Sequence, residues 1–264
     1  MDATAFFGIE ATGDDRRWRL PVVPELCSTR GALFGGVGLG AAIDRLEHVT
    51  GRSLVWATAQ FLSFAKPPTV VELGLDEIVR GHHVTQARVV ARVDGDEIFT
   101  VVAALGRRPG TWHGSWAIRP EVREPWESPP RALESHHRGT LAERLDVRLA
   151  DARPAEELPG PPGRGNSALW VHLPDLALSA AALAIVGDYV PFGIGQALGE
   201  RVGGNSLDNT LRVAGRRASE WILADVRVHA VEDGFGHGLV HLWAEDGTLL
   251  GTASQSTIVR PWER

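Results

Sequence analysis

Three polar residues in the last third of the chain, Asp188, Ser206 and Gln255, are candidates for chemistry. Asp188 follows an alanine-rich apolar stretch, Ser206 begins a strand-like stretch, and Gln255 lies among small polar residues near the C-terminal end. Singly, each has an ordinary structural explanation, as a turn residue, a strand opener or a solvent-facing amide. A carboxylate, a hydroxyl and an amide that converge can hold a water molecule for attack on a carbonyl carbon. The elements around them must therefore decide whether they meet.

Two other enzyme-like patterns do not hold. Residues 204–208, Gly-Asn-Ser-Leu-Asp, resemble a nucleophile elbow, but Asp208 stands where the second glycine is required. A strand rather than a helix is also expected to follow, which argues against a serine-hydrolase triad. Residues 35–40 are glycine-rich at the start of a helix, yet they lack the dinucleotide spacing and a parallel βαβ pattern. We therefore expect no cofactor, and close helix packing explains these glycines better.

The ten histidines form no recognisable metal motif. The adjacent pairs at residues 82–83 and 136–137 would point to opposite sides of a strand, so they cannot easily chelate one ion. No HExxH string occurs, and Cys27 is the single cysteine of the chain. We expect no dedicated metal site.

Composition narrows the function classes. The net charge of −6 and the isoelectric point near 5.9 argue against a nucleic-acid partner, which normally requires a basic face. One cysteine excludes an intrachain disulfide and fits a reducing cytoplasm. The N-terminal residues lack the pattern of a secretory signal, and no stretch approaches the ~20 apolar residues of a membrane span. These features predict a cytoplasmic location and no membrane span.

Two stretches, residues 69–108 and 219–260, look like one module written twice. Each contains three alternating strand-like runs with an Asp-Gly turn before the last, at Asp94-Gly95 and Asp246-Gly247. Each follows a small-residue helix, predicted at residues 31–49 and 175–186, and one further strand, predicted at 56–65 and 205–213. Such an internal repeat constrains topology more strongly than local propensity does.

The repeat predicts an α+β fold in which two helix-on-sheet units join edge to edge in a continuous sheet of nine or ten antiparallel strands. Residues 4–10 and 16–23 are predicted as two further short strands, and Pro191 is expected to prevent the second helix from continuing. The glycines before the first helix predict close approach to a flat partner such as a sheet. Residues 109–167 are rich in proline and are interpreted as a tether, which gives three parts: 1–108, 109–167 and 168–264.

With these elements in order, the chain resembles the acyl-CoA thioesterase II group, whose fold is the double hotdog. The resemblance covers roughly residues 25–108 and 168–262. The matching strings are Leu33-Phe34-Gly35-Gly36 in the first copy, and Gly187-Asp188, Ser206-Leu207-Asp208-Asn209-Thr210 and Ala253-Ser254-Gln255 in the second.

The resemblance implies hydrolysis of medium- to long-chain fatty acyl-CoA by a water molecule that Asp188, Ser206 and Gln255 hold. Backbone N–H groups at Gly35 and Gly36 could stabilise the oxyanion. Arg107, Arg108 and Arg260 are candidates for the CoA phosphates. An acyl-CoA partner and, as in many hotdog proteins, a homo-oligomer are expected.

Two departures from the family pattern leave alternatives open. Val37 stands where the family often has glutamine, and Asn209 stands where it has histidine. These changes indicate that the first copy is a structural partner and that the second carries any chemistry. A non-catalytic acyl-CoA-binding protein with the same fold is one alternative. A hotdog enoyl-CoA hydratase is a weaker one, because no Asp and His stand at the spacing which that reaction needs.

Overall fold

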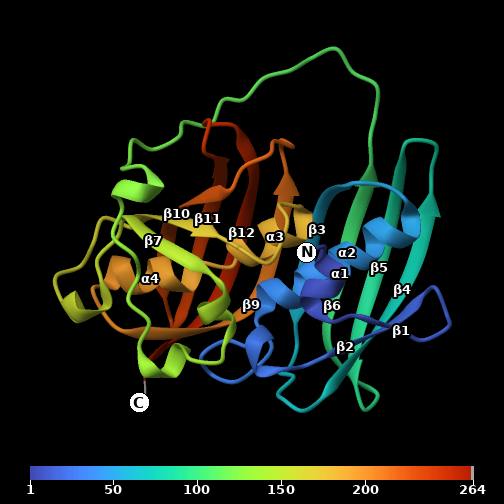
Figure 1. The fold of residues 1–264 in the computed structure, drawn as a ribbon, viewed down its shortest axis with the longest axis horizontal. Coiled ribbons are helices and arrows are strands. Elements are labelled where there is room, and N and C mark those ends of the chain that lie inside the picture. Colours follow the sequence, from blue (N-terminus) through green and yellow to red (C-terminus); the bar gives the residue numbers. More distant parts are fainter. Residues whose placement is uncertain (263–264) are drawn as a thin grey trace.

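One continuous sheet of antiparallel strands organises the computed structural model, which describes residues 1–262 (Figure 1). Twelve strands of the described chain lie in the order β1-β2-β4-β5-β6-β3-β9-β12-β11-β10-β8-β7. The strands are β1 (Glu10–Ala11), β2 (Arg17–Pro21), β3 (Leu54–Phe61), β4 (Val70–Arg80), β5 (Val84–Val93), β6 (Asp96–Gly106), β7 (Asp146–Asp151), β8 (Asn166–His172), β9 (Val202–Val213), β10 (Trp221–Glu232), β11 (Phe235–Ala244) and β12 (Leu249–Pro261). The α-helices are α1 (Ala3–Phe7), α2 (Gly35–Thr50), α3 (Ala180–Val186) and α4 (Val190–Leu198).

The strand order confirms the duplication. The order β4-β5-β6-β3 in the first half is mirrored by β10-β11-β12-β9 in the second, and the two halves meet where β3 pairs with β9. At this junction Thr58 lies opposite Thr210, and their hydroxyl oxygens are 2.9 Å apart. The sheet therefore has no edge between the halves, as the edge-to-edge prediction required, although it has more strands than predicted.

The glycines of α2 serve mainly to bring two helices together. A Cβ atom added to Gly36 would lie 2.7 Å from the carbonyl oxygen of Ala184, and one added to Gly40 would lie 2.9 Å from that of Ala181. Both contacts are with the backbone of α3, so the prediction of a flat partner was incomplete. Gly38 does face the sheet, against the ring of Phe99 on β6, and Gly35 faces the ring of Phe61 on β3. This packing places the N-terminus of α2, from the first half, beside the C-terminus of α3, from the second.

The second predicted helix ends at Val186 as expected, but it starts later than predicted and a further helix follows it. It begins at Ala180 rather than at residue 175, because the side chain of Ser179 accepts a hydrogen bond from the amide of Ala182 and caps the helix. Pro191 does not terminate the helical segment; it lies in the first turn of α4, where its missing N–H costs nothing. Residues 180–198 have the length and composition of a membrane span, but 78% of that window is buried inside the fold.

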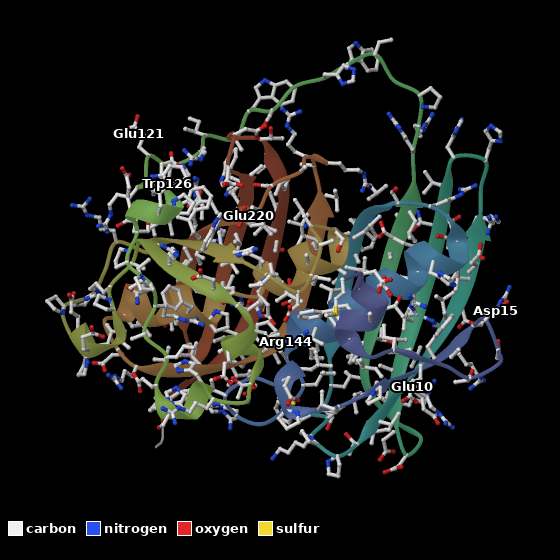
Figure 2. All side chains as sticks on the ribbon, in the orientation of Figure 1. Glu10, Asp15, Glu121, Trp126, Arg144 and Glu220 are labelled. Carbon is white, nitrogen blue, oxygen red and sulfur yellow. The ribbon has the colours of Figure 1, made fainter. Side chains whose placement is uncertain are left out.

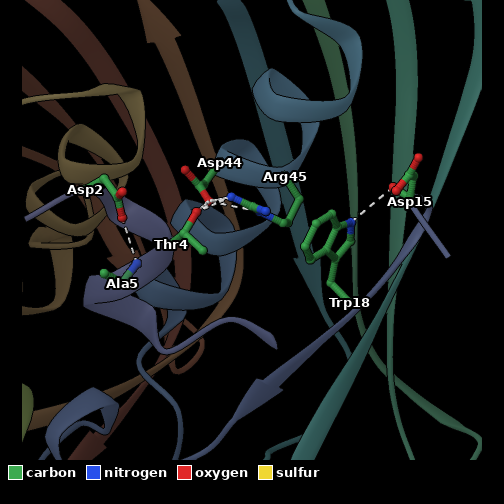
Figure 3. A network of polar contacts seen from close by, with 7 residues as sticks. All are labelled: Asp2, Thr4, Ala5, Asp15, Trp18, Asp44 and Arg45. Carbon is green, nitrogen blue, oxygen red and sulfur yellow. Dashed lines mark hydrogen bonds and ion pairs between the residues drawn. The ribbon is translucent and has the colours of Figure 1, made fainter. Parts of the chain in front are cut away.

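The N-terminal residues also differ from the prediction. Residues 4–10 do not form one strand: most of them belong to α1, which Asp2 caps by accepting a hydrogen bond from the amide of Ala5, and only Glu10 lies in β1. The strand predicted at 16–23 is present as β2. Helix α1 then docks on α2 through the bond from the Thr4 hydroxyl to Asp44, which also binds Arg45 (Figure 3). The buried guanidinium of Arg45 lies 4.4 Å from the centre of the Trp18 ring on β2. Through these contacts α1 and β2 hold α2 in place.

Residues 109–167 are more than a linker. They supply β7, which pairs with β8. They also contain four 3₁₀ turns: η2 (Pro125–Glu127), η3 (Ser135–His137), η4 (Leu141–Arg144) and η5 (Ala155–Glu157). A further 3₁₀ turn, η1 (Pro24–Leu26), precedes α2. The first part of the segment runs over the outer face of the sheet, where Arg123 accepts a hydrogen bond from the indole of buried Trp170. Trp126, labelled in Figure 2, stays largely exposed there, whereas the guanidinium carbon of Arg144 lies 3.6 Å from the ring centre of Phe6.

Candidate functional site

A β-bulge on β9 brings Ser206 to the face of the sheet that carries Gln255. Gln255 on β12 lies opposite Asn209, whereas Thr257 lies opposite Ser206, so Leu207 is left without a partner. Strict alternation along β9 would place residues 206 and 209 on opposite faces. The extra residue reverses the alternation, and both side chains then face the helices.

Asp188 lies between α3 and α4, directly above β12. Gly187 caps α3, and a Cβ atom on it would lie 2.7 Å from the Cβ atom of Ala253. A residue with a side chain at position 187 would therefore hold α3 away from the sheet. With glycine there, the carboxylate of the next residue reaches Gln255, which is two positions beyond Ala253 on the same face of β12.

The three candidate residues are in direct contact. The amide of Gln255 donates to Asp188 Oδ1 and, at 2.5 Å, to Ser206 Oγ. The Ser206 hydroxyl donates to Asp188 Oδ1 at 3.5 Å. The other carboxylate oxygen, Oδ2, accepts a hydrogen bond of 2.7 Å from the backbone N–H of Gly36. The carboxyl group thus receives donors from both halves of the protein.

Burial makes this carboxyl group a weaker acid than usual. Asp188 is 6% exposed, and desolvation raises its pKa from 3.8 to about 7. The hydrogen bonds from Gly36, Gln255 and Ser206 favour the ionised form and oppose this rise. A carboxylate whose pKa lies near neutrality can accept a proton from water in one step and return it in the next.

A cavity of about 460 Å³ reaches the carboxyl group from outside. Asp188 and Ser206 are among its lining residues, whereas Gln255 lies behind them, 3% exposed. Most of the wall is apolar and comes from both halves and from residues 141–145; it includes Leu33, Phe34, Phe61, Ile98, Phe99, Leu141, Leu145 and Phe192. Such a cavity, apolar with a few convergent polar groups, is typical of a small-molecule site.

The sequence itself carries a family signature. The profile of the acyl-CoA thioesterase C-terminal domain matches residues 119–259, more than half of the chain. A protein of known structure from Novosphingobium aromaticivorans, assigned as a thioesterase, is 33% identical, with 96% of this chain and 98% of that one covered and a TM-score of 0.82. The chain belongs to the acyl-CoA thioesterase family. It is a thioester hydrolase.

More distant structures establish the fold of the thioesterase. A hotdog-fold protein from Alicyclobacillus acidocaldarius is 19% identical over 99% of this chain and 98% of that one, with a TM-score of 0.84. An acyl-CoA thioesterase II from Mycobacterium marinum is 18% identical, with 100% and 98% covered and a TM-score of 0.76. No curated protein matches the sequence. The double hotdog architecture predicted from the repeat is confirmed.

The glycines proposed for substrate binding lie at the site of the thioesterase. Gly35 lines the cavity, and a Cβ atom on it would lie 2.9 Å from Asp188 Oδ2 and 3.1 Å from the Phe61 ring. Gly36 uses its N–H on the carboxylate of Asp188. Because both glycines belong to α2, the first half takes a direct part in the site, beyond the structural role expected from the sequence.

The arginines proposed for the CoA phosphates are not gathered at this cavity. Arg107 and Arg108 follow β6 at the end opposite Phe99, so Arg107 lies about 27 Å along the strand from the cavity wall. Arg260 lies nearer, because it pairs with Gly203 beside the cavity-lining Gly204, but its side chain is exposed and does not line the cavity.

Four basic residues that the sequence did not assign to the site line the cavity instead: Arg30, Lys66, Arg131 and His137. The Nε atom of Arg131 is buried and has no hydrogen-bond partner among residues 1–262. Arg30 binds Asn205 at 3.3 Å, which ties it to β9. The one usable signal was Lys66, the only lysine of the chain. The others stand on loops and turns that no repeat pattern marks.

Within residues 1–262, no group of three or more His, Cys, Asp or Glu side chains could hold a metal ion. Cys27 lines the cavity, and desolvation raises the pKa of its thiol to about 11. The thiol therefore stays protonated at neutral pH and is a poor nucleophile. Asp188 carries the one carboxyl group among the described residues that line the cavity, and its raised pKa suits it to proton transfer.

Proposed function

We propose that the thioesterase hydrolyses medium- to long-chain acyl-CoA to a free acid and CoA, with a water molecule that Asp188 activates. The observation that carries this proposal is the buried carboxyl group of raised pKa, which faces an apolar cavity beside Ser206 and is held by Gln255. A thiolate is a good leaving group, so a positioned water and a base suffice for the reaction.

In the first step, the water bound to Asp188 and Ser206 attacks the thioester carbonyl carbon and gives a proton to the carboxylate. The tetrahedral intermediate then collapses, the carbon–sulfur bond breaks, and Asp188 returns the proton to the departing sulfur. The products are the fatty acid and CoA thiol, and the carboxylate is regenerated. Gln255 holds both side chains by its two N–H bonds throughout.

The N-terminus of α2 is suited to the negative charge that develops on the carbonyl oxygen. Gly35 is its first residue and lines the cavity, and the N–H of a first helical residue has no acceptor within its own helix. The helix dipole adds partial positive charge at the same end. Donors fixed in this way stabilise an oxyanion without having to reorganise during the reaction.

The two ends of the substrate fit different parts of the cavity. The apolar wall suits an acyl chain, and each buried CH₂ group contributes about 0.8 kcal/mol, or about a fourfold gain in affinity. Arg30, Lys66 and Arg131 supply positive charge for the CoA phosphates. Arg131 is the best placed, because its buried Nε has no partner in the described chain. The cytoplasmic location and the homo-oligomer expected from the sequence stay predictions.

Thiol release, followed with a chromogenic thiol reagent over a series of acyl-CoA chain lengths, tests this function. We expect kcat/KM to rise about fourfold per added CH₂ until the apolar wall is filled, and then to level off. Absence of thiol release at every chain length would leave an acyl-CoA-binding protein as the better account. Release that does not depend on chain length would contradict the assignment of the cavity to the acyl chain.

A further inference from the structure

An unpartnered amide lies next to Gln255. Asn209 on β9 is 1% exposed, and neither its Nδ2 nor its Oδ1 atom has a hydrogen-bond partner among residues 1–262. The Oε1 atom of Gln255 is likewise buried and without a partner in that range. Buried polar groups are nearly always satisfied, so two orphans in one place require an explanation.

The two orphans are complementary and face each other. Asn209 and Gln255 are directly opposed in the β9–β12 pairing and share the inner face, which places their Cβ atoms about 5 Å apart. One side chain lacks an acceptor for its N–H group, and the other lacks a donor for its carbonyl oxygen. On β12, Ser254 and Ser256 point to the outer face, and the next inward-facing side chain, Thr257, already donates to the carbonyl oxygen of Ile258.

We propose that Asn209 is a positioning residue for the hydrolytic reaction: its Nδ2–H donates to Oε1 of Gln255, directly or through one bridging water, and thereby fixes the Gln255 N–H groups toward Asp188 and Ser206. This inference rests on the proposed roles of Asp188 and Gln255. It adds a residue that lies behind the cavity wall and touches neither the substrate nor the attacking water.

The orientation of the Gln255 amide matters because its two ends differ in polarity but hardly in shape. With Nε2 toward Asp188, the amide stabilises the carboxylate anion. After a flip, Oε1 would face Asp188, and this arrangement is favourable only when the carboxyl group is protonated. Asn209 holds the first orientation, and so it favours the ionised base. Its loss should raise the pKa of Asp188 above the value that burial already sets.

Among residues 1–262, Asp188 forms no ion pair and its hydrogen-bond partners are uncharged. Its partners are the Gly36 amide on α2, Ser206 on β9 and Gln255 on β12, and Tyr189 follows it before α4. The other titratable groups that line the same cavity are Cys27, Arg30, Lys66, Arg131, His137 and Tyr189. The Asn209 variants leave all of them in place, so a change in the pH profile reports on the amide contact.

Asn209→Leu, which keeps the branched shape of the side chain but has no donor, tests the proposal together with Gln255→Ala and the double variant. We expect Asn209→Leu to lower kcat about tenfold, to leave KM within twofold, and to move the acidic limb of the kcat/KM profile to higher pH. In the Gln255→Ala background the same substitution should change kcat by less than twofold. Thr210→Val is the matched control, because Thr210 is the next residue, faces the outer side of the sheet and bonds Thr58. This variant should change neither kcat nor the pH profile.

A parent-like pH profile for Asn209→Leu would overturn the proposal, as would an equal loss of kcat in the Gln255→Ala background. If Asn209→Leu does not fold, Asn209→Ala carries the same comparison. The proposed hydrolysis by a water held at Asp188 is tested separately. Full turnover by Asp188→Asn would contradict that mechanism, whatever the result for Asn209. Loss of turnover in Asp188→Asn with none in Asn209→Leu would overturn the role of Asn209 alone.

Discussion

Replacing Asp188 with asparagine should damage activity and relieve a stability cost at the same time. The substitution keeps the size of the side chain but removes the base. General-base catalysis contributes about 10²- to 10⁴-fold, so kcat should fall within that range. In the parent, kcat/KM should rise about tenfold per pH unit below about 7 and level off above it, because only the ionised carboxylate accepts a proton. The variant should lose this dependence.

The effect on stability follows from the same pKa. The carboxyl group holds its proton up to about pH 7 in the folded protein but releases it near 3.8 when unfolded, so the parent loses stability as the pH rises through this window. The full difference corresponds to about 4 kcal/mol, of which about 2.5 kcal/mol falls between pH 5 and pH 8. An asparagine stays neutral throughout and avoids this loss.

Urea unfolding of both proteins at pH 5 and pH 8 measures this contribution, since any fixed cost of the substitution cancels in the comparison. Relative to the parent, the variant should gain about 2–3 kcal/mol between the two pH values. Asp225→Asn is the control for activity, because Asp225 is buried on the outer face against Arg227 and should not affect turnover. More than a tenth of parental kcat in Asp188→Asn, or a stability difference that is the same at both pH values, would refute the reasoning.

Three further substitutions test the other parts of the site. Ser206→Ala should lower kcat about tenfold at constant KM and shift the acidic limb to higher pH, because a hydrogen bond that lowers the pKa of Asp188 is lost; an unchanged pH–rate profile would count against this. Gly35→Ala should cost at least about tenfold in kcat and about 1–3 kcal/mol in unfolding free energy, because the new Cβ meets the carboxylate at 2.9 Å; parental values in both assays would exclude that contact. Arg131→Gln should raise KM for acyl-CoA about threefold to tenfold but leave KM for an acyl-pantetheine without phosphates unchanged. Arg107→Gln should change neither KM value. A raised KM for acyl-CoA in Arg107→Gln, with no change in Arg131→Gln, would instead place the phosphate site at the end of β6.

The duplicated architecture could be predicted because alternation and Asp-Gly turns repeat at matched positions. Asp94 and Gly95 both adopt positive φ in a tight hairpin turn, which such pairs favour. The ends of the helices are harder to predict from the sequence. A proline breaks a helix when it falls in the interior but is favourable in the first turn, as Pro191 is in α4, and the sequence alone does not distinguish the two cases.

The residues of the candidate site were found by resemblance rather than by periodicity. Ser206 faces inward only because Leu207 forms a β-bulge, and an alternating sequence pattern does not predict where a bulge will occur. Arg107 and Arg108 were expected near the groove between the two halves, but the eleven residues of β6 carry them to the end of that strand far from the cavity. Arg131 and His137 reach the cavity from loop and 3₁₀ segments, whose course depends on tertiary packing rather than on local pattern.

The central claim is that water itself, held at Asp188, attacks the thioester. A single-turnover reaction in heavy-oxygen water, with the intact mass of the protein followed over time, tests it most directly. The account predicts one heavy oxygen in the fatty acid product and an unchanged protein mass at every time point. A protein species heavier by the acyl group, or heavy oxygen in the carboxyl group of Asp188, would contradict it.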